Sequence, residues 1–247
     1  MTAFVPPDLN GLWRREVITT PAGYRDETTR VLWLQTRSWY ADLRVRADRP
    51  SRPGATGFAD YTDAELIGLA AQQGFAGELT AQDGVCLWRR DLDFQPPSAD
   101  PDEATYAVEG EVMIEDGIHS DYQEIWRREA DSTAPLSAYR LVEDMAVPAR
   151  AGLLVIGGSH FLEILDRPRP LPAGDSLAAI VTAALAVGDR AAAEAALSLR
   201  ICFGRIEDGV GRILLSTFPW LEGQTWRRDQ ERQWTLIDST GPAGAAP

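Results

Sequence analysis

The sequence predicts a mainly β protein built from antiparallel strands, and three observations support that fold class. Apolar and polar residues alternate with a period of two along most of the chain. The alternating runs end at turn-forming pairs such as Asp208 and Gly209. A helical pattern is confined to a short segment at 62–73 and a longer Ala-rich segment at 175–197. These features favour one closed antiparallel barrel or two small ones, and a β-sandwich is the alternative that the same alternation permits.

The composition describes a globular chain and excludes several functions. The chain has 247 residues, of which 45% are hydrophobic and eight are Trp, which suffices for one large β unit or two small domains. A net charge of −13 argues against nucleic acid and anionic membrane surfaces as partners. Every basic side chain is Arg and none is Lys, which excludes a lysine Schiff base with pyridoxal phosphate. We expect no cofactor.

The two cysteines and two histidines do not form a metal-ligand pattern. Cys86 and Cys202 are far apart in apolar strand-like runs, which indicates buried free thiols. His119 and His160 have no ligand spacing, so no metal site is expected. The first residues lack a signal-peptide pattern, and the longest apolar stretch, near 177–187, is too short to span a bilayer. We therefore expect a cytoplasmic protein.

The first third of the chain predicts three strands and a helix. The strands are expected at 12–18, 29–36 and 39–46. In the first strand Trp13 and Arg15 share one face, while Arg14 and Glu16 share the other. The predicted helix at 62–73 begins with a capping box, in which Thr62 and Glu65 bond to each other's backbone N–H groups.

The central stretch 84–129 predicts a β-meander, with a tight hairpin turn at Asp116 and Gly117. Further strands are expected at 139–147, 153–156 and 161–165. We assign residues 1–166 to a first β-barrel.

The last third combines helix and strand. A proline-rich linker at 167–172 precedes the helical segment 175–197, which Gly188 and Asp189 interrupt. The final strands are expected at 198–206, 211–217 and 233–237. We assign 167–240 to a unit that packs on the barrel or completes a second β unit, and 241–247 to a disordered tail.

A short motif, Trp-Arg-Arg followed by an acid, occurs four times, beginning at Trp13, Trp88, Trp126 and Trp226. On a strand the Trp and the second Arg share one face, where guanidinium can stack on indole. One interpretation is that these pairs plug the ends of a barrel. The other is that they surround an anionic or aromatic ligand.

The candidate ligand site lies on two strands of the meander. Glu109, Glu111 and Glu115 share a face with Met113, which is either exposed or lines a polar lumen. The face of the next strand mixes aromatic and charged side chains, as ligand cavities do. The predicted ligand-binding residues are Trp88, Arg90, Glu111, Met113, Tyr122, Glu124, Trp126 and Arg128. An enclosed volume of roughly 300 Å³ or more would support binding, and a filled lumen would not.

His119 is the candidate catalytic residue. It follows the predicted turn and lies beside hydroxyl and carboxyl groups that could orient it as a general base. Ser159 beside His160 is not expected to be a nucleophile, because Phe161 occupies the last position of a Gly-x-Ser-x-Gly pattern.

Several segments resemble a known family. Gly11, Leu12 and Trp13 are similar to the Gly-x-Trp motif of lipocalins, in which that Trp closes the barrel and an Arg from a late strand packs over it. More widely, residues 10–165 resemble the lipocalin-like family typified by the yeast Hri protein and its uncharacterised bacterial relatives. The residues that carry this likeness are Phe75 to Gly77, Trp88 with Asp91 and Asp93, Glu124 to Trp126, and Leu154 to Gly158. The resemblance implies a calycin-like barrel and brings no reaction.

Three functions follow from these patterns. The first is a cytoplasmic lipocalin-like protein that binds a small, largely apolar molecule, with an anionic group as an option. The alternative is a cofactor-free lyase, isomerase or hydratase that uses His119 or the meander carboxylates. The third is an interaction protein with a filled barrel. The sequence leaves open whether the protein forms a homodimer.

Overall fold

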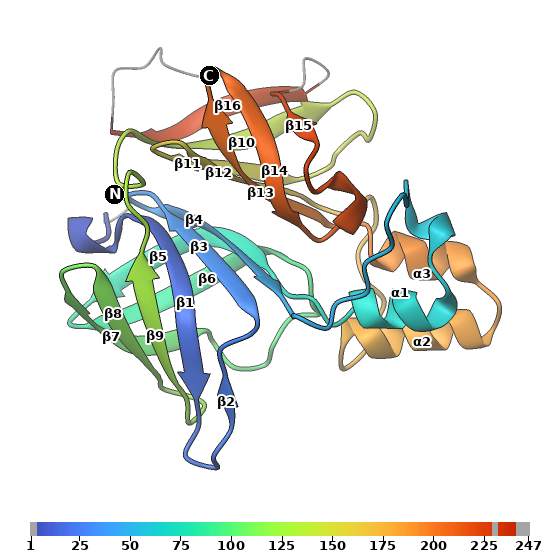
Figure 1. Ribbon diagram of the computed structural model, residues 1–247, viewed down its shortest axis with the longest axis horizontal. Helices are drawn as coiled ribbons and strands as arrows, with labels where there is room; N and C mark the ends of the chain where they lie inside the picture. The colour runs from blue at the N-terminus through green and yellow to red at the C-terminus, as the bar shows by residue number, and fades with distance from the viewer. Residues whose placement is uncertain (1–3, 229–231, 241–247) are drawn as a thin grey trace.

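The strands of the protein form two antiparallel sheets, seen in a computed structural model that describes residues 4–228 and 232–240 (Figure 1). The first sheet closes on itself, because β1 hydrogen-bonds to β9, and makes an eight-stranded barrel. Its strands are β1 (Gly11–Thr19), β3 (Arg30–Gln35), β4 (Trp39–Val45), β5 (Phe75–Gln82), β6 (Val85–Asp93), β7 (Glu103–Glu109), β8 (Val112–Gly117) and β9 (Gln123–Arg128), with the short β2 (Arg25–Asp26) beside β1. The predicted mainly β, antiparallel barrel is therefore confirmed.

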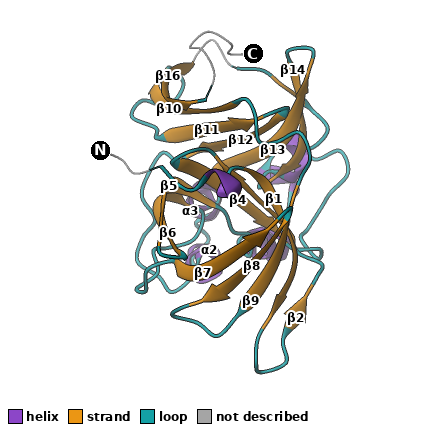
Figure 2. Ribbon diagram, turned by 90° about the vertical axis from the view of Figure 1, so that its left-hand side faces the viewer, coloured by secondary structure: helices purple, strands orange, loops and turns teal. Residues whose placement is uncertain are grey.

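The second sheet has seven strands and is open, so it is not a second barrel. In spatial order its strands are β15 (Thr225–Trp226), β14 (Val210–Ser216), β13 (Arg200–Glu207), β12 (His160–Leu165), β11 (Gly152–Gly157), β10 (Leu136–Asp144) and β16 (Arg232–Ser239). Figure 2 shows this sheet on one side of the barrel. The predicted tail, 241–247, lies outside the described residues.

Strands β10 to β12 belong to the second sheet, although we assigned them to the first unit from the sequence. The last barrel strand ends at Arg128, and β12 pairs with β13 rather than with any barrel strand. Every residue of β11 and β12 is buried, because one face of these strands packs in the core shared with the barrel and the other in a second hydrophobic cluster formed within the sheet. Alternation in the sequence identifies a strand but carries no information about its partner.

The tight turn predicted at Asp116 and Gly117 is wrong in position, because both residues belong to β8, which ends at Gly117. The chain reverses just afterwards, over residues 118–122, before β9 begins at Gln123. The preceding reversal, between β7 and β8, lies at Gly110, whose φ of 61° is in the left-handed region. Gly117 is needed for a different reason: a Cβ there would lie 2.3 Å from the carbonyl oxygen of Ser120 and 2.4 Å from the ring of Tyr122. The meander order over 84–129 is confirmed, since β6 to β9 are neighbours in sequence and in the sheet.

Three short helices pack at one side of the two sheets (Figure 1). They are α1 (Asp63–Leu69), α2 (Leu177–Ala186) and α3 (Arg190–Ala196). The Thr62–Glu65 capping box at the start of α1 is present as predicted, although the helix ends before residue 73. Gly188, with a φ of 77°, separates α2 from α3 at the predicted interruption.

A shared hydrophobic core joins the barrel, the open sheet and the helices. Leu34 and Leu43 point outward from the barrel and pack with Leu162 of β12 and Val155 of β11. These side chains are completely buried. The barrel strand β4 therefore has two buried faces: Trp39, Ala41, Leu43 and Val45 face the shared core, and Tyr40, Asp42 and Arg44 face the lumen. The inward residues of this strand are the polar ones.

Candidate functional site

One half of the barrel lumen is filled by side chains. Trp13, Trp33, Trp126 and Met113 pack there, each with an exposed fraction of 2% or less. The N-terminal 3₁₀ turn (Pro7–Leu9) covers this end, and the indole N–H of Trp13 donates to the Leu9 carbonyl at 2.8 Å.

Arg128 closes the filled end. Its guanidinium lies 5.1 Å from the ring centre of Trp13, donates to a carboxylate oxygen of Glu111 at 2.6 Å and donates to the Asp8 carbonyl at 2.8 Å. The structure thus places two of the predicted ligand residues, Glu111 and Arg128, and also Met113, away from the open end of the barrel. For this Trp-Arg pair the plug interpretation fits the geometry.

Replacing Arg128 with leucine should lower the free energy of unfolding by about 1–2 kcal/mol, because a stacked guanidinium with several charge-assisted hydrogen bonds is lost. The control is Arg127→Leu, since the Arg127 side chain is 48% exposed and pairs with Glu16 on the surface. Denaturant titration of both variants should show the loss for Arg128→Leu alone. A loss of equal size in both variants would contradict the plug.

The other half of the lumen contains a cavity of about 390 Å³, which we call the inner cavity. Its lining residues are Ile18, Trp33, Asp42, Arg44, Gln73, Phe75, Trp88, Arg90, Asp102, Glu115, Ser120, Tyr122, Glu124 and Trp126. Trp33 meets Trp88 and Trp126 edge-on, with ring centres 5.7 and 5.9 Å apart. The inner cavity therefore combines an aromatic floor with charged walls, and its volume exceeds the value that we set for ligand binding.

Two carboxyl groups face each other in the wall of the inner cavity. Glu115 on β8 and Glu124 on β9 are directly opposite cross-strand partners and are 5% and 2% exposed. Glu124 accepts a 2.6 Å hydrogen bond from Arg15, so its charge is balanced. Glu115 accepts only from the Tyr122 hydroxyl, at 3.0 Å, and forms no ion pair within the described residues. Burial, and then the neighbouring charge of Glu124, hold the pKa of Glu115 well above its ordinary value.

The raised pKa of Glu115 makes stability depend on pH. A carboxyl whose pKa is higher in the folded state contributes stability below its unfolded pKa, near 4.5, and loses that contribution as the pH rises. Glu115→Gln should therefore become progressively more stable than the wild type as the pH rises above 4.5. Glu109→Gln removes an exposed carboxyl from the neighbouring strand and should follow the wild type. Urea titrations between pH 4 and 9 test this; parallel curves for wild type and Glu115→Gln would contradict it.

Arg44 and Asp42 form a second charged pair in the inner cavity. The Nε of Arg44 donates to Asp42 Oδ1 at 3.0 Å, and its guanidinium lies 5.0 Å from the ring centre of Phe75. Burial raises the pKa of Asp42 to about 6, although Arg44 opposes the rise. Within the described part of the chain, neither Nη atom of Arg44 forms a hydrogen bond. Its Nη1 lies 4.0 Å from a carboxylate oxygen of Glu124. Arg44 can therefore donate to a ligand.

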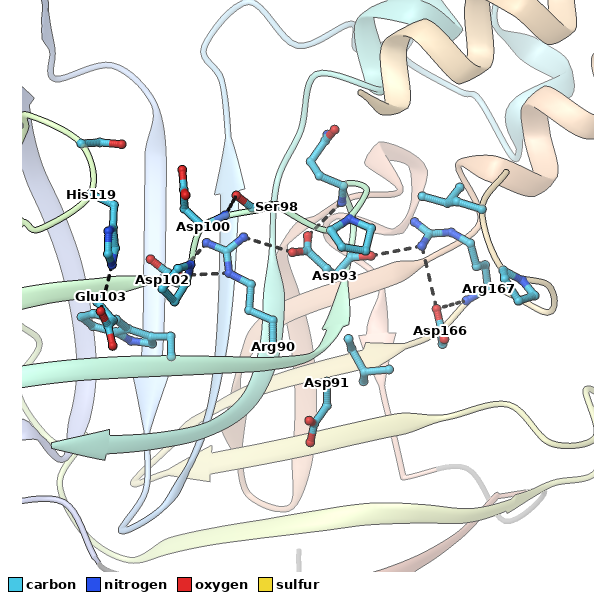
Figure 3. A pocket seen from close by; sticks show the side chains of 18 of the residues that line it. Arg90, Asp91, Asp93, Ser98, Asp100, Asp102, Glu103, His119, Asp166 and Arg167 are labelled. Carbon is cyan, nitrogen blue, oxygen red and sulfur yellow. Dashed lines mark hydrogen bonds and ion pairs between the residues drawn. The ribbon is translucent and has the colours of Figure 1, made fainter. Parts of the chain in front are cut away.

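A larger cleft of about 590 Å³, the outer cleft, adjoins the inner cavity (Figure 3). The two spaces share Trp88, Arg90, Asp102, Ser120 and Tyr122. Arg90 lies at their boundary, where it donates to Asp102 at 2.6 Å and to Asp93 at 3.0 Å while stacking on Phe75 at 3.6 Å. The outer cleft gives a small molecule a route toward the inner cavity.

His119 lies in the wall of the outer cleft, where Figure 3 shows it above Glu103. Its Nε2 is 2.9 Å from a carboxylate oxygen of Glu103, and both side chains are about one-third exposed, at 37% and 31%. His119 lies in the loop between β8 and β9 rather than directly after a tight turn. The carboxylate of Glu103 orients its imidazole. His160 is instead buried in the second sheet.

The structure brings five of the eight predicted ligand residues to the inner cavity: Trp88, Arg90, Tyr122, Glu124 and Trp126. Selection from the sequence missed Asp42, Arg44 and Glu115, and also Arg15, which pairs with Glu124. A signal was present for Arg15 and Glu115, since Trp13 with Arg15 and Met113 with Glu115 share strand faces. No such signal marked Asp42 and Arg44.

No metal site or membrane helix is found in the described chain. Among residues 4–228 and 232–240, no cluster of three His, Cys, Asp or Glu side chains has a metal-binding arrangement. None of the described helices has both the length and the apolar character that crossing a bilayer requires.

Comparison with known proteins shows the fold alone. No protein-family model matches the sequence, and no curated protein is significantly similar to it. Among solved structures, an uncharacterized protein of Saccharomyces cerevisiae superposes with a TM-score of 0.55 at 15% identity, covering 94% of this chain and 99% of the yeast chain. The likeness in fold therefore extends over nearly the whole of both chains.

Proposed function

We propose that this protein binds a small molecule in the inner cavity, and that the ligand joins an ammonium group to a hydrogen-bond acceptor such as a carboxylate. The observation that carries the proposal is the buried Glu115, which faces Glu124 without a cation of its own. The barrel likeness supports it, because small antiparallel barrels hold single ligands at one end. A lipocalin-like relationship is part of this proposal.

The proposed ammonium group would compensate the repulsion between the carboxylates of Glu115 and Glu124. Two carboxylates directly opposite each other on one face of a sheet repel, and burial strengthens the repulsion. The empty protein relieves it by keeping a proton on Glu115. An ammonium group can take the place of that proton, and the resulting ion pair is strengthened by its exclusion from water.

The proposed acceptor group would accept hydrogen bonds from donors of Arg44 and Trp126 that have no partner among the described residues. Both Nη atoms of Arg44 lack hydrogen bonds within the described residues, and so does the buried indole N–H of Trp126. A buried donor without a partner costs about 1–3 kcal/mol, so a ligand acceptor that reaches it gains affinity. The rings of Trp33, Trp88 and Phe75 provide a surface for an apolar or aromatic part of the ligand.

Three matched probes test the proposal: phenylalanine, which has both groups; phenethylamine, which has the amine alone; and 3-phenylpropionate, which has the acid alone. Thermal-shift titrations of the wild type should rank phenylalanine first and phenethylamine second, with no shift from 3-phenylpropionate, because a ligand stabilises only the state that it binds. Glu115→Gln should lose the response to both amines, and Glu109→Gln should keep it. A shift from the acid alone, or an unchanged amine response in Glu115→Gln, would refute the proposal.

Proton transfer is the second candidate function, and the His119–Glu103 pair favours it. A carboxylate 2.9 Å from the imidazole fixes its orientation, as a general base requires. A bound ligand in the outer cleft would then lose a proton to His119 without a cofactor. Exchange of substrate-carbon hydrogen with D₂O, abolished in His119→Gln while probe binding persists, would support this activity; exchange that persists in the variant would exclude His119.

The cytoplasm is the proposed location. Cys86 and Cys202 are both buried free thiols, which suits a reducing compartment.

A further inference from the structure

The second sheet carries a separate cavity on the face that points away from the barrel. The shared core covers one face of this sheet, while Ile213, Cys202 and Trp226 belong to a small hydrophobic cluster on the other. These three residues also line a cavity of about 630 Å³. This cavity shares no lining residue with the inner cavity or the outer cleft.

Arginine dominates the charged lining of this cavity. In the described lining, Arg200, Arg227, Arg228 and Arg232 accompany a single carboxylate, Glu163. Such a concentration of positive charge is unusual in a protein whose net charge is −13. Electrostatic attraction between a positive cavity and an anion raises both the affinity and the rate of association.

Glu163, the one carboxylate in the described lining, is already engaged. Glu163 is 3% exposed, accepts a 2.5 Å hydrogen bond from Arg200 and accepts a 3.2 Å hydrogen bond from the indole N–H of Trp226. Trp226 also stacks on Phe161, with ring centres 4.2 Å apart. Glu163 therefore balances Arg200 and holds Trp226 in place, while Arg232 pairs with Asp144 at 3.1 Å. Of the described lining arginines, Arg227 is exposed and Arg228 is partly buried, and both can bind a ligand.

Several arginine donors have no acceptor among the described residues. The Nε atoms of Arg200 and Arg150 are buried without a hydrogen-bond partner within the described chain. Arg228 stacks on Tyr139 at 4.2 Å, and Arg227 is exposed and forms no ion pair with any described residue. Burial lowers the pKa of Arg150, and the charges of Arg200 and Arg232 act in the same direction although Asp144 opposes them. Arg150 and Arg232 both pair with Asp144, at 3.5 and 3.1 Å, so the donors available to an anion in the described lining are those of Arg227 and Arg228 and the buried Nε of Arg200.

We propose that this cavity is a second binding site, and that it takes a phosphomonoester whose organic part lies against Trp226. Planar guanidinium groups match the oxygen geometry of phosphate and can donate two parallel hydrogen bonds to it. Arg227 and Arg228 hold the phosphate, and the buried Arg200 completes the site. The proposal is independent of the amine site in the barrel.

Isothermal titration calorimetry with phenyl phosphate, inorganic phosphate and benzoate tests this site. Phenyl phosphate should bind more tightly than inorganic phosphate, and benzoate should bind weakest. The variant Arg227→Gln/Arg228→Gln should weaken phenyl phosphate binding at least about tenfold, as the loss of charge-assisted hydrogen bonds implies. The control Arg205→Gln removes an exposed arginine outside the cavity and should leave affinity unchanged.

Three outcomes would contradict the proposed phosphate site. No heat from phenyl phosphate, equal affinity in the double variant, or an equal loss in Arg205→Gln would mean that the arginines form no specific cavity for phosphate. Melting temperatures measured without ligand establish that the variants are folded, since Arg227 is exposed and Arg228 is only partly buried. The amine probes of the barrel should bind the double variant as they bind the wild type, which separates failure here from failure of the proposed function.

Discussion

Replacing Arg15 with methionine is expected to lower the free energy of unfolding by about 3–5 kcal/mol, the usual cost of breaking a buried ion pair by removing one partner. Arg15 is 9% exposed and donates to Glu124 at 2.6 Å in the wall of the inner cavity. Without it, Glu124 loses its 2.6 Å ion pair, retains only the longer 4.0 Å approach of Arg44 among the described residues, and faces Glu115 across the strand pair. Urea denaturation measures the loss.

A second substitution should rescue the first. Glu124→Gln in the Arg15→Met background removes the stranded charge, so most of the lost stability should return. Arg14→Met is the matched control, because the Arg14 side chain points outward from the same strand and is 45% exposed. An Arg15→Met variant that is as stable as Arg14→Met would show that Arg15 does not neutralise the lumen carboxylates.

Leu162→Ala should destabilise the barrel and the open sheet together, by about 2–5 kcal/mol. Leu162 is completely buried in β12 and packs in the core that Leu43 of the barrel shares. Because one core serves both sheets, its loss should raise the hydrogen-exchange rates of β6 to β8 as well as those of β13 and β14.

Leu214→Ala provides the comparison for Leu162→Ala. Leu214 lies on β14 but is 42% exposed, so its truncation should change exchange little in either sheet. Faster exchange confined to the second sheet in Leu162→Ala would show that the two sheets unfold independently and that the shared core does not couple them.

The sequence was sufficient to identify most strands but not their partners. Period-two alternation placed β6 to β9 in the right order because neighbouring strands of a meander pair with each other. The same alternation could not place β10 to β12, since a strand with two buried faces reads alike in either sheet. The Asp116 and Gly117 pair indicated the right reversal but the wrong position, because both residues end β8 and the chain turns over 118–122, where the missing Cβ of Gly117 allows the close approach of Ser120 and Tyr122.

Part of the candidate site could not be found from the sequence, because one barrel strand has its apolar residues facing outward and its polar residues facing the lumen. The Trp-Arg-Arg segments revealed Trp88 with Arg90, and Trp126, because aromatic residues that alternate with charge suggest a lined cavity. Strand β4 concealed Asp42 and Arg44, since its apolar residues face outward into the core shared with the second sheet. Sequence patterns alone assign the apolar face to the barrel interior. Only the presence of the second sheet corrects that assignment.

The protonation state of Glu115 tests the account most directly. In protein labelled with ¹³C at the glutamate carboxyl carbon, comparison with Glu115→Gln identifies the Glu115 resonance. The account predicts a protonated Glu115 at pH 7 in the empty protein, and its conversion to carboxylate when phenylalanine saturates the inner cavity. A Glu115 that titrates near 4.5 without ligand, or whose resonance does not change at saturation, would contradict the account.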